Sequence, residues 1–179
     1  MILGELACRN ARRYPKKTAV VFENKRYTFE EFNNRINSLA NALLGMGLSK
    51  GDRVAVLLDD CNQYLEIYFS IPKAGMVAAP LNTTLSKENL AYIINDPGAN
   101  TVILGENYVE TIYGIRSNLN TVKNFITVGP PPEGMKSYEE LVSRYPSDEP
   151  KVEIDENDIA SILYTSGTTG LPKGVMLSH

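Results

Sequence analysis

One stretch of twelve residues near the end of the chain combines glycines, small hydroxyl side chains and a single lysine. It runs from Tyr164 to Val175 and reads YTSGTTGLPKGV. Glycines let backbone N–H groups approach an anion closely, hydroxyl groups add donors, and lysine is a common partner of phosphate. The residues that would supply these features are Gly167, Gly170, Gly174, Thr165, Ser166, Thr168, Thr169 and Lys173. The composition therefore predicts a phosphate-binding loop.

The spacing within this stretch excludes two better-known phosphate-binding loops. A P-loop needs Lys and then Ser or Thr directly after its second glycine, whereas Leu171 and Pro172 follow Gly170 here. The G-x-G-x-x-G fingerprint of dinucleotide-binding folds is also absent. Apolar runs over 159–164 and 175–178 predict flanking strands, so the stretch is expected to be a hairpin-like clamp. A flexible Gly/Thr hairpin loop that binds no ligand is the alternative.

The same twelve residues resemble, without a gap, the signature loop of the adenylate-forming (AMP-binding) enzymes. This superfamily includes acyl-CoA synthetases, adenylation domains of peptide synthetases and firefly-type luciferases. Further segments resemble the family in the same order: Tyr27–Phe32, Gly51–Val56, Lys73–Gly75, Val77–Asn82 and Met176–His179. Among the branches of the superfamily, the chain most resembles acyl-CoA synthetases of the long-chain fatty acid–CoA ligase type.

The resemblance implies a two-step reaction that uses ATP, Mg²⁺ and coenzyme A. A carboxylate, here a fatty acid, attacks the α-phosphate of ATP and releases pyrophosphate, and the thiol of coenzyme A then displaces AMP. In this family the signature loop holds the β- and γ-phosphates, a task of positioning and charge stabilisation that needs no nucleophile. Carried over residue by residue, the phosphate contacts are Thr165, Ser166, Gly167, Thr168, Thr169, Gly170 and Lys173.

The other working parts of the family lie downstream of its signature loop. They are the adenine and ribose motifs, the acidic metal ligand, the hinge and a small C-terminal domain with a catalytic lysine. We therefore expect residues 1–179 to be an inactive N-terminal part of the AMP-binding domain, without a catalytic residue or metal ligand of its own. Two alternatives stay open: a stand-alone module that binds nucleotide or pyrophosphate without catalysis, and a structural role in which the loop binds nothing.

Composition narrows the range of possible partners and cellular compartments. The net charge of -3 gives no broad attraction for nucleic acid or an anionic membrane. Cys8 and Cys61 are the only cysteines and lack C-x-x-C spacing, which favours free thiols in a reducing compartment. No apolar stretch approaches the ~20 residues of a transmembrane helix, and no signal peptide is evident. We expect a cytoplasmic protein with small-molecule partners and no transmembrane segment.

Two charged clusters have ordinary interpretations. The basic residues Arg9, Arg12, Arg13, Lys16 and Lys17 are interpreted as the solvated face of an N-terminal helix. The pair of carboxylates at positions 59 and 60 is interpreted as a strand-end turn, because no third type of metal ligand lies nearby in the sequence. The lysine at position 73 is assigned to a helix end with a glycine cap.

The patterning along the chain predicts an α/β fold, with a mostly parallel sheet covered by helices on both faces. Strands are expected at 18–22, 26–28, 53–58, 77–81, 101–104 and 125–128, and helices at 2–14, 28–44, 62–74, 87–95, 108–118 and 137–145. Capping boxes, Thr28 with Glu31 and Ser137 with Glu140, mark two helix starts. The expected organisation is an α/β part over 1–145, a linker over 146–157 and the strands of the phosphate loop over 158–179.

The strand after the loop carries a further expectation. Its partners in the sheet would be partly missing from a chain of this extent, so an unpaired edge and an apolar face would be exposed. Such an edge favours self-association or domain swapping. The single histidine, His179, directly follows this strand, where family members keep a histidine near the acyl or nucleotide pocket.

Overall fold

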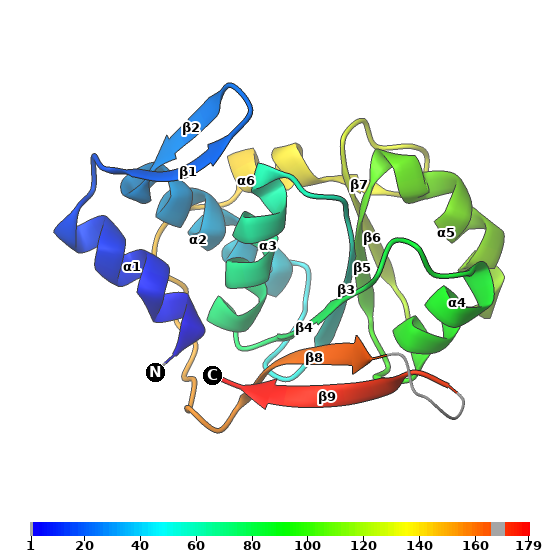
Figure 1. Cartoon of the computed structure of the whole chain (residues 1–179). Coiled ribbons are helices and arrows are strands. Elements are labelled where there is room, and N and C mark those ends of the chain that lie inside the picture. Colours follow the sequence, from blue (N-terminus) through cyan, green and yellow to red (C-terminus); the bar gives the residue numbers. More distant parts are fainter. Residues whose placement is uncertain (1, 166–170) are drawn as a thin grey trace.

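A seven-stranded sheet forms the centre of the computed structural model, which describes residues 2–165 and 171–179 (Figure 1). The strand order is β7-β6-β5-β3-β4-β8-β9. All neighbouring pairs are parallel except β8 and β9, which form an antiparallel hairpin. The strands are β3 (Arg53–Leu57), β4 (Val77–Pro80), β5 (Thr101–Gly105), β6 (Asn124–Val128), β7 (Lys136–Ser137), β8 (Ile159–Thr165) and β9 (Lys173–Ser178).

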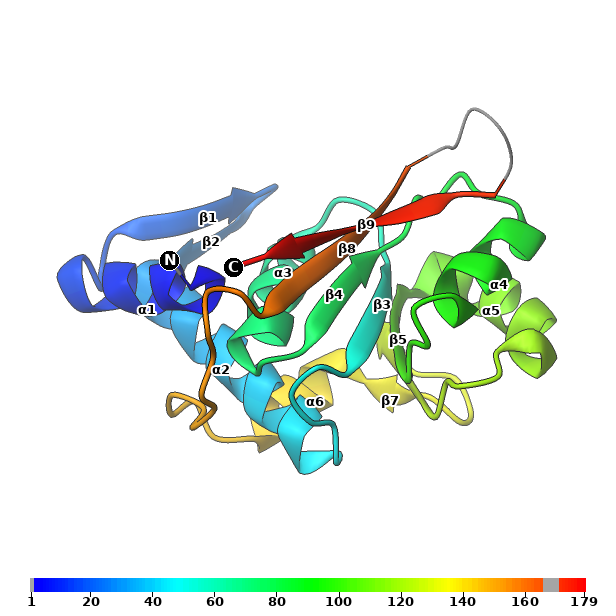
Figure 2. The ribbon, with the colours of Figure 1, turned by 90° about the horizontal axis from the view of Figure 1, so that it is seen from below.

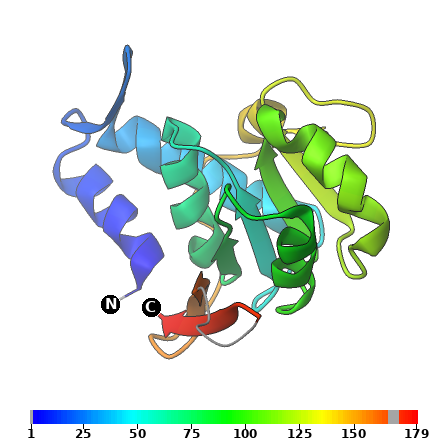
Figure 3. The ribbon, with the colours of Figure 1, turned by 45° about the vertical axis from the view of Figure 1, so that its right-hand side comes forward.

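Helices cover both faces of this sheet and enclose two separate hydrophobic cores. One core lies beneath α2 (Phe29–Gly45), α3 (Asn62–Lys73) and α6 (Tyr138–Arg144), and the other beneath α4 (Lys87–Asn95) and α5 (Val109–Ile115). Strand β3 shows why: Val54 and Val56 join the first core, and Ala55 and Leu57 join the second, because successive side chains point to opposite faces. Figure 3 shows the two helical layers on either side of the sheet. The predicted α/β class is confirmed.

A smaller unit at the N-terminus packs beside the main sheet. It consists of α1 (Leu3–Arg13) and a two-stranded antiparallel sheet of β1 (Thr18–Phe22) and β2 (Lys25–Thr28). The capping box predicted at Thr28 and Glu31 is present and starts α2, with the Glu31 carboxylate 2.8 Å from the Thr28 backbone nitrogen. At the second predicted box only one of the two hydrogen bonds is present in the described residues: the hydroxyl of Ser137 accepts from the backbone N–H of Glu140.

Most element boundaries shift by one or two residues from the sequence prediction, and three elements show the reason for a difference. The helix expected over 108–118 is α5 flanked by two short 3-10 turns, at Glu106–Tyr108 and Arg116–Asn118. Gly114 weakens its last turn, and the Asn118 carbonyl accepts from the Asn95 amide instead of continuing the helix (2.7 Å). Strand β7 was not predicted, because two residues carry no periodicity. The helix over 62–74 ends at Lys73, where Pro72 stands in the last turn and Gly75 adopts φ +74.

Residues 146–158, called the strap below, connect α6 to β8 without regular secondary structure (Figure 2). The strap follows α2, where the Asn37 amide donates to the Ser147 carbonyl and the Asn41 amide donates to the Pro146 and Asp148 carbonyls, each at 2.9 Å. At its other end Lys50 forms a 2.6 Å ion pair with Asp158. The strap is therefore fixed along its length, and it determines where β8 enters the sheet.

Within residues 2–165 and 171–179, no helix combines the length and the apolar character that crossing a membrane requires.

Candidate phosphate-binding site

The β8–β9 hairpin places the first and last candidate ligands opposite each other. Thr165 ends β8, Lys173 begins β9, and the two residues are register partners. Both are exposed, so the hydroxyl and the ammonium group are accessible to a ligand. The hairpin predicted from the apolar flanks is confirmed. The five candidates between them, Ser166, Gly167, Thr168, Thr169 and Gly170, lie outside the described residues.

The paired residues Thr165 and Lys173 lie at the carboxyl edge of the parallel sheet. Strand β8 is parallel to β4, β4 to β3 and β3 to β5, so all four strands end at the same edge. From β3, the chain proceeds first to β4 on one side and then to β5 on the other. Such a reversal of strand order leaves a crevice outside the carboxyl ends, where open α/β sheets bind ligands. Thr165 ends β8 at this same edge, with β4 between β8 and β3.

Polar groups follow the neighbouring strands at this edge. After β4, the Asn82 side-chain oxygen accepts from the backbone N–H and the hydroxyl of Thr84, at 2.9 and 2.8 Å. After β3, Asp59 accepts a hydrogen bond from the Tyr108 hydroxyl, and this bond raises the pKa of Tyr108. The strand-end turn predicted at positions 59 and 60 agrees with this arrangement. In the described part of the chain no group of three or more His, Cys, Asp or Glu side chains could hold a metal ion.

Tyr164 anchors the end of β8 to the helix layer. Its hydroxyl donates to Asp96, whose other carboxylate oxygen lies 3.4 Å from the Tyr92 hydroxyl. Burial and the contact with Asp96 raise the pKa of Tyr164, so the phenol keeps its proton and remains a donor. The contact between Tyr164 and Asp96 was not predicted from the sequence. The partners are 68 positions apart, and no local pattern signals their pairing.

A buried lysine fixes the strap that leads into β8. The Lys73 ammonium lies 2.7 Å from a Glu149 carboxylate oxygen and donates to the Asn33 side-chain oxygen at 2.9 Å. Glu149 also accepts from the amides of Asn33 (2.9 Å) and Asn37 (3.2 Å). Burial opposes its ionisation, but the hydrogen bonds from Lys73, Asn33 and Asn37 prevail and lower the pKa of Glu149 to about 2. The helix end predicted at Lys73 is confirmed, whereas its partner in the strap was not foreseen.

His179 lies at the other end of the hairpin, beside α1. Its Nδ1 accepts from the Leu3 backbone N–H at 3.1 Å, and its backbone N–H donates to the Asp158 carbonyl at 3.2 Å. Burial lowers the pKa of the imidazole, which favours the neutral form. Because β8 and β9 are antiparallel, a whole strand separates this histidine from Lys173.

The Thr165 hydroxyl and the Lys173 ammonium group can both donate hydrogen bonds to one anion at the carboxyl edge of the sheet. A hydroxyl and a lysine fit the phosphates of a nucleotide. The described residues include no carboxylate cluster for a divalent cation.

Comparison with known proteins identifies the family of the chain. The family described as AMP-binding enzyme matches residues 8–179. A medium-chain-fatty-acid–CoA ligase of Ectopseudomonas oleovorans is 32% identical over 190 residues, covering 100% of this chain and 35% of that protein. The long-chain-fatty-acid–CoA ligase FadD13 of Mycobacterium tuberculosis is 36% identical over 157 residues, covering 86% of this chain and 30% of that protein. The chain spans about a third of the length of these curated relatives.

Solved structures show the same fold. The anthranilate CoA ligase AuaEII in complex with anthranoyl-AMP superposes with a TM-score of 0.95 and 30% identity, covering 99% of this chain and 35% of that one. The N-terminal domain of FACL13 from Mycobacterium tuberculosis has a TM-score of 0.90 and 33% identity, covering 99% of this chain and 44% of that one.

Proposed function

The chain belongs to the family of AMP-binding enzymes, and from this premise we propose that it is the N-terminal part of an ATP-dependent carboxylic acid–CoA ligase. In this role it contributes the β8–β9 hairpin that holds the phosphates of ATP. The observation that carries the proposal is the pairing of Thr165 with Lys173 at the carboxyl edge of the sheet, the edge at which the strand order also reverses.

The proposed chemistry assigns a supporting task to these residues. When bound, ATP supplies the α-phosphate that the substrate carboxylate attacks and the pyrophosphate that leaves. The Lys173 ammonium offsets negative charge on the departing phosphates, and the Thr165 hydroxyl donates a hydrogen bond to them. Fixed donors of this kind stabilise charge that develops in the transition state. Ser166, Gly167, Thr168, Thr169 and Gly170 complete the proposed set of phosphate contacts, and coenzyme A is the proposed acceptor in the second step.

The proposed substrate is a fatty acid. Support comes from relatives named as medium-chain and long-chain fatty acid–CoA ligases. We also propose that catalysis depends on parts of the family fold that the 179 residues do not contain. The chain alone is then expected to bind nucleotide or pyrophosphate without turnover.

Calorimetric titration of Mg-ATP into the 179-residue chain tests the phosphate role. We expect Lys173→Met to weaken binding about tenfold or more, because one charge-assisted contact to phosphate is lost. Lys151→Met removes the same charge from an exposed position in the strap and serves as the matched control. Equal affinities of the two variants would contradict the assignment of Lys173. Pyrophosphate exchange catalysed by the 179-residue chain alone would contradict the proposal that catalysis needs further parts of the family fold.

A further inference from the structure

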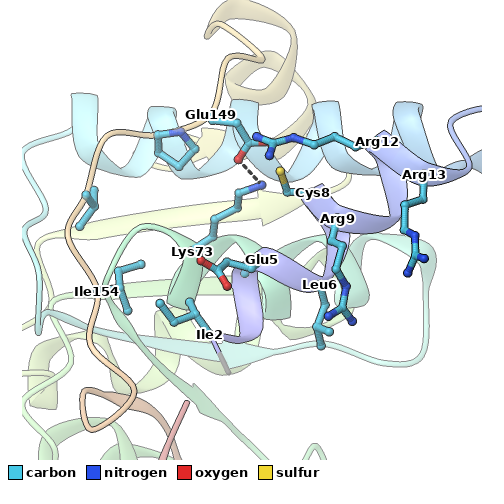
Figure 4. Close-up of a pocket in the computed structure, with 13 residues that line it drawn as sticks. Ile2, Glu5, Leu6, Cys8, Arg9, Arg12, Arg13, Lys73, Glu149 and Ile154 are labelled. Carbon is cyan, nitrogen blue, oxygen red and sulfur yellow. Dashed lines mark ion pairs between the residues drawn. The ribbon is translucent and has the colours of Figure 1, made fainter.

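A groove of about 690 Å³ lies between α1 and the strap, away from the phosphate loop (Figure 4). One wall is the outer side of α1, the other is the strap from Glu149 to Ile154, and Lys73 lies in the floor. The volume falls within the roughly 300–1,000 Å³ of small-molecule sites. The strap enters β8 at Ile159, and Thr165 ends that strand about 20 Å further on. The groove is therefore a separate place from the proposed nucleotide site.

Helix α1 has a buried and an exposed face, and the groove is lined mainly by the exposed one, with Gly4 at its margin. Gly4 and Ala7 are buried on the inner face. A Cβ at Gly4 would lie 2.7 Å from the Lys73 Cβ, so glycine permits the close approach of α1 to α3. Glu5, Arg9 and Arg12 recur at helical spacing on the outer face and line the groove. Three of the basic residues that were interpreted as a solvated helix face therefore form a wall of this groove. They are Arg9, Arg12 and Arg13.

The charge of the groove is positive although the chain as a whole is acidic. Four cationic side chains and two carboxylates line it, an excess of two positive charges, whereas the net charge of the chain is -3. Lys73 and Glu149 are paired with each other. Arg9 and Arg12 take part in no ion pair within the residues that the structure describes. The unbalanced charge is therefore carried by exposed arginines, which suit carboxylate or phosphate groups.

The opposite part of the groove is apolar. Ile2, Val152 and Ile154 line it, whereas Leu6, which also lines the groove, lies beside Arg9 (Figure 4). Figure 4 shows Ile2 and Ile154 together at one end, and Arg12 and Arg13 at the other. Glu5 lies near Ile2, where its carboxylate disfavours an anionic head at the apolar end. The distribution defines both the charge and the orientation of a fitting ligand.

We propose that this groove binds a small amphiphilic anion, whose acidic head contacts Arg9 and Arg12 and whose aliphatic chain lies along Ile2 and Ile154. Both a free fatty acid and an alkyl phosphate present this chemistry. The site is independent of the proposed catalytic function, because binding here requires neither ATP nor the phosphate loop.

Cys8 lines the groove and provides a direct reporter. Cys61, the other cysteine of the chain, precedes α3 and is absent from the lining, so it serves as an internal control. The experiment measures alkylation of each thiol in the 179-residue chain by N-ethylmaleimide, resolved by peptide mass spectrometry. With saturating decanoate we expect Cys8 to react at least about threefold more slowly, by mass action on the occupied form, while the rate at Cys61 stays unchanged.

Head-group probes separate the sources of binding. Decyl phosphate reports on a phosphorylated ligand and decanoate on a fatty acid, and protection by either supports the site. Decanol and decyltrimethylammonium carry the same chain with a neutral and a cationic head, and neither should protect Cys8. Equal protection by decanol, equal slowing at Cys61, or no protection by either anion would overturn the proposal.

Variants locate the head of the ligand. The double variant Arg9→Gln/Arg12→Gln should lose protection of Cys8 by decanoate. Lys16→Gln/Arg26→Gln makes the same change in charge at exposed positions outside the groove and should keep it. All four side chains are exposed, so we expect both double variants to fold, and circular dichroism of each checks this. Retention of full protection by the Arg9/Arg12 variant would contradict the assigned contacts.

Discussion

Lys73 and Glu149 connect segments that are remote in the sequence. The lysine ends α3, the glutamate belongs to the strap, and Asn33 and Asn37 of α2 complete the hydrogen bonding of the carboxylate. The Lys73 side chain is 6% exposed. A buried ammonium without a partner is costly, so the pair fixes the strap beside the groove and directs the chain into β8.

Glu149 predicts a specific dependence of stability on pH. Its pKa is about 2 in the folded chain against an ordinary 4.5. The stabilisation is therefore complete above about pH 4.5 and is lost as the pH falls toward 2. Because the side chain is 40% exposed, solvent screening limits its contribution to about 1–2 kcal/mol. We expect Glu149→Gln to lower the free energy of unfolding by this amount at pH 6, and the difference from wild type to shrink as the pH falls from 4.5 toward 2.

Urea unfolding at a series of pH values measures this difference. Glu133→Gln is the control, because Glu133 is exposed in a loop and its side chain makes no hydrogen bond or ion pair within the described chain. A difference between wild type and Glu149→Gln that stays constant from pH 6 to pH 3 would rule out the assigned linkage.

At the scale of elements, the β8–β9 hairpin carries the proposed phosphate-binding residues and also forms an unpaired edge of the sheet. Every residue of β9 is exposed, including Val175 at 46%, Met176 at 67% and Leu177 at 40%. Strand β9 is the last in the sheet, so one row of its backbone donors and acceptors has no neighbouring strand. Apolar side chains on an open edge favour pairing with another chain, and we propose that the 179-residue chain self-associates through β9.

Met176→Lys is expected to reduce this self-association, because a charge on an edge strand opposes edge-to-edge pairing. Sedimentation velocity over a concentration series gives the measurement. Leu65→Lys is the matched control, since Leu65 is 42% exposed but lies on α3, away from any strand edge. A wild-type chain that stays monomeric at every concentration, or a control that dissociates the assembly equally, would refute the role of β9.

The same elements show how far the sequence predicts the fold. The helix over Lys87–Asn95 and the strand over Thr18–Phe22 match their predicted bounds, because periodicity and turn residues are local signals. The partners Tyr164 and Asp96, and Lys73 and Glu149, were not foreseen, because the tertiary fold alone brings them together. The groove was not predicted for the same reason, because the strap that forms one wall is far from α1 in the sequence.

For the whole molecule, topology and composition converge on one edge of the sheet. The strands β3, β4, β5 and β8 end there, and the glycine- and hydroxyl-rich stretch starts at the end of β8. The helices on both faces hold these strand ends in place through two separate cores. The account of function depends on the claim that Lys173 acts on the phosphates of ATP.

The exchange of radioactive pyrophosphate into ATP, measured with decanoate in the complete ligase that we propose to contain this chain, tests that claim most directly. We predict that Lys173→Met lowers the exchange rate about 100-fold or more, as expected for the loss of one donor to developing charge, while Lys151→Met stays near wild type. Exchange by Lys173→Met at the wild-type rate would contradict the account.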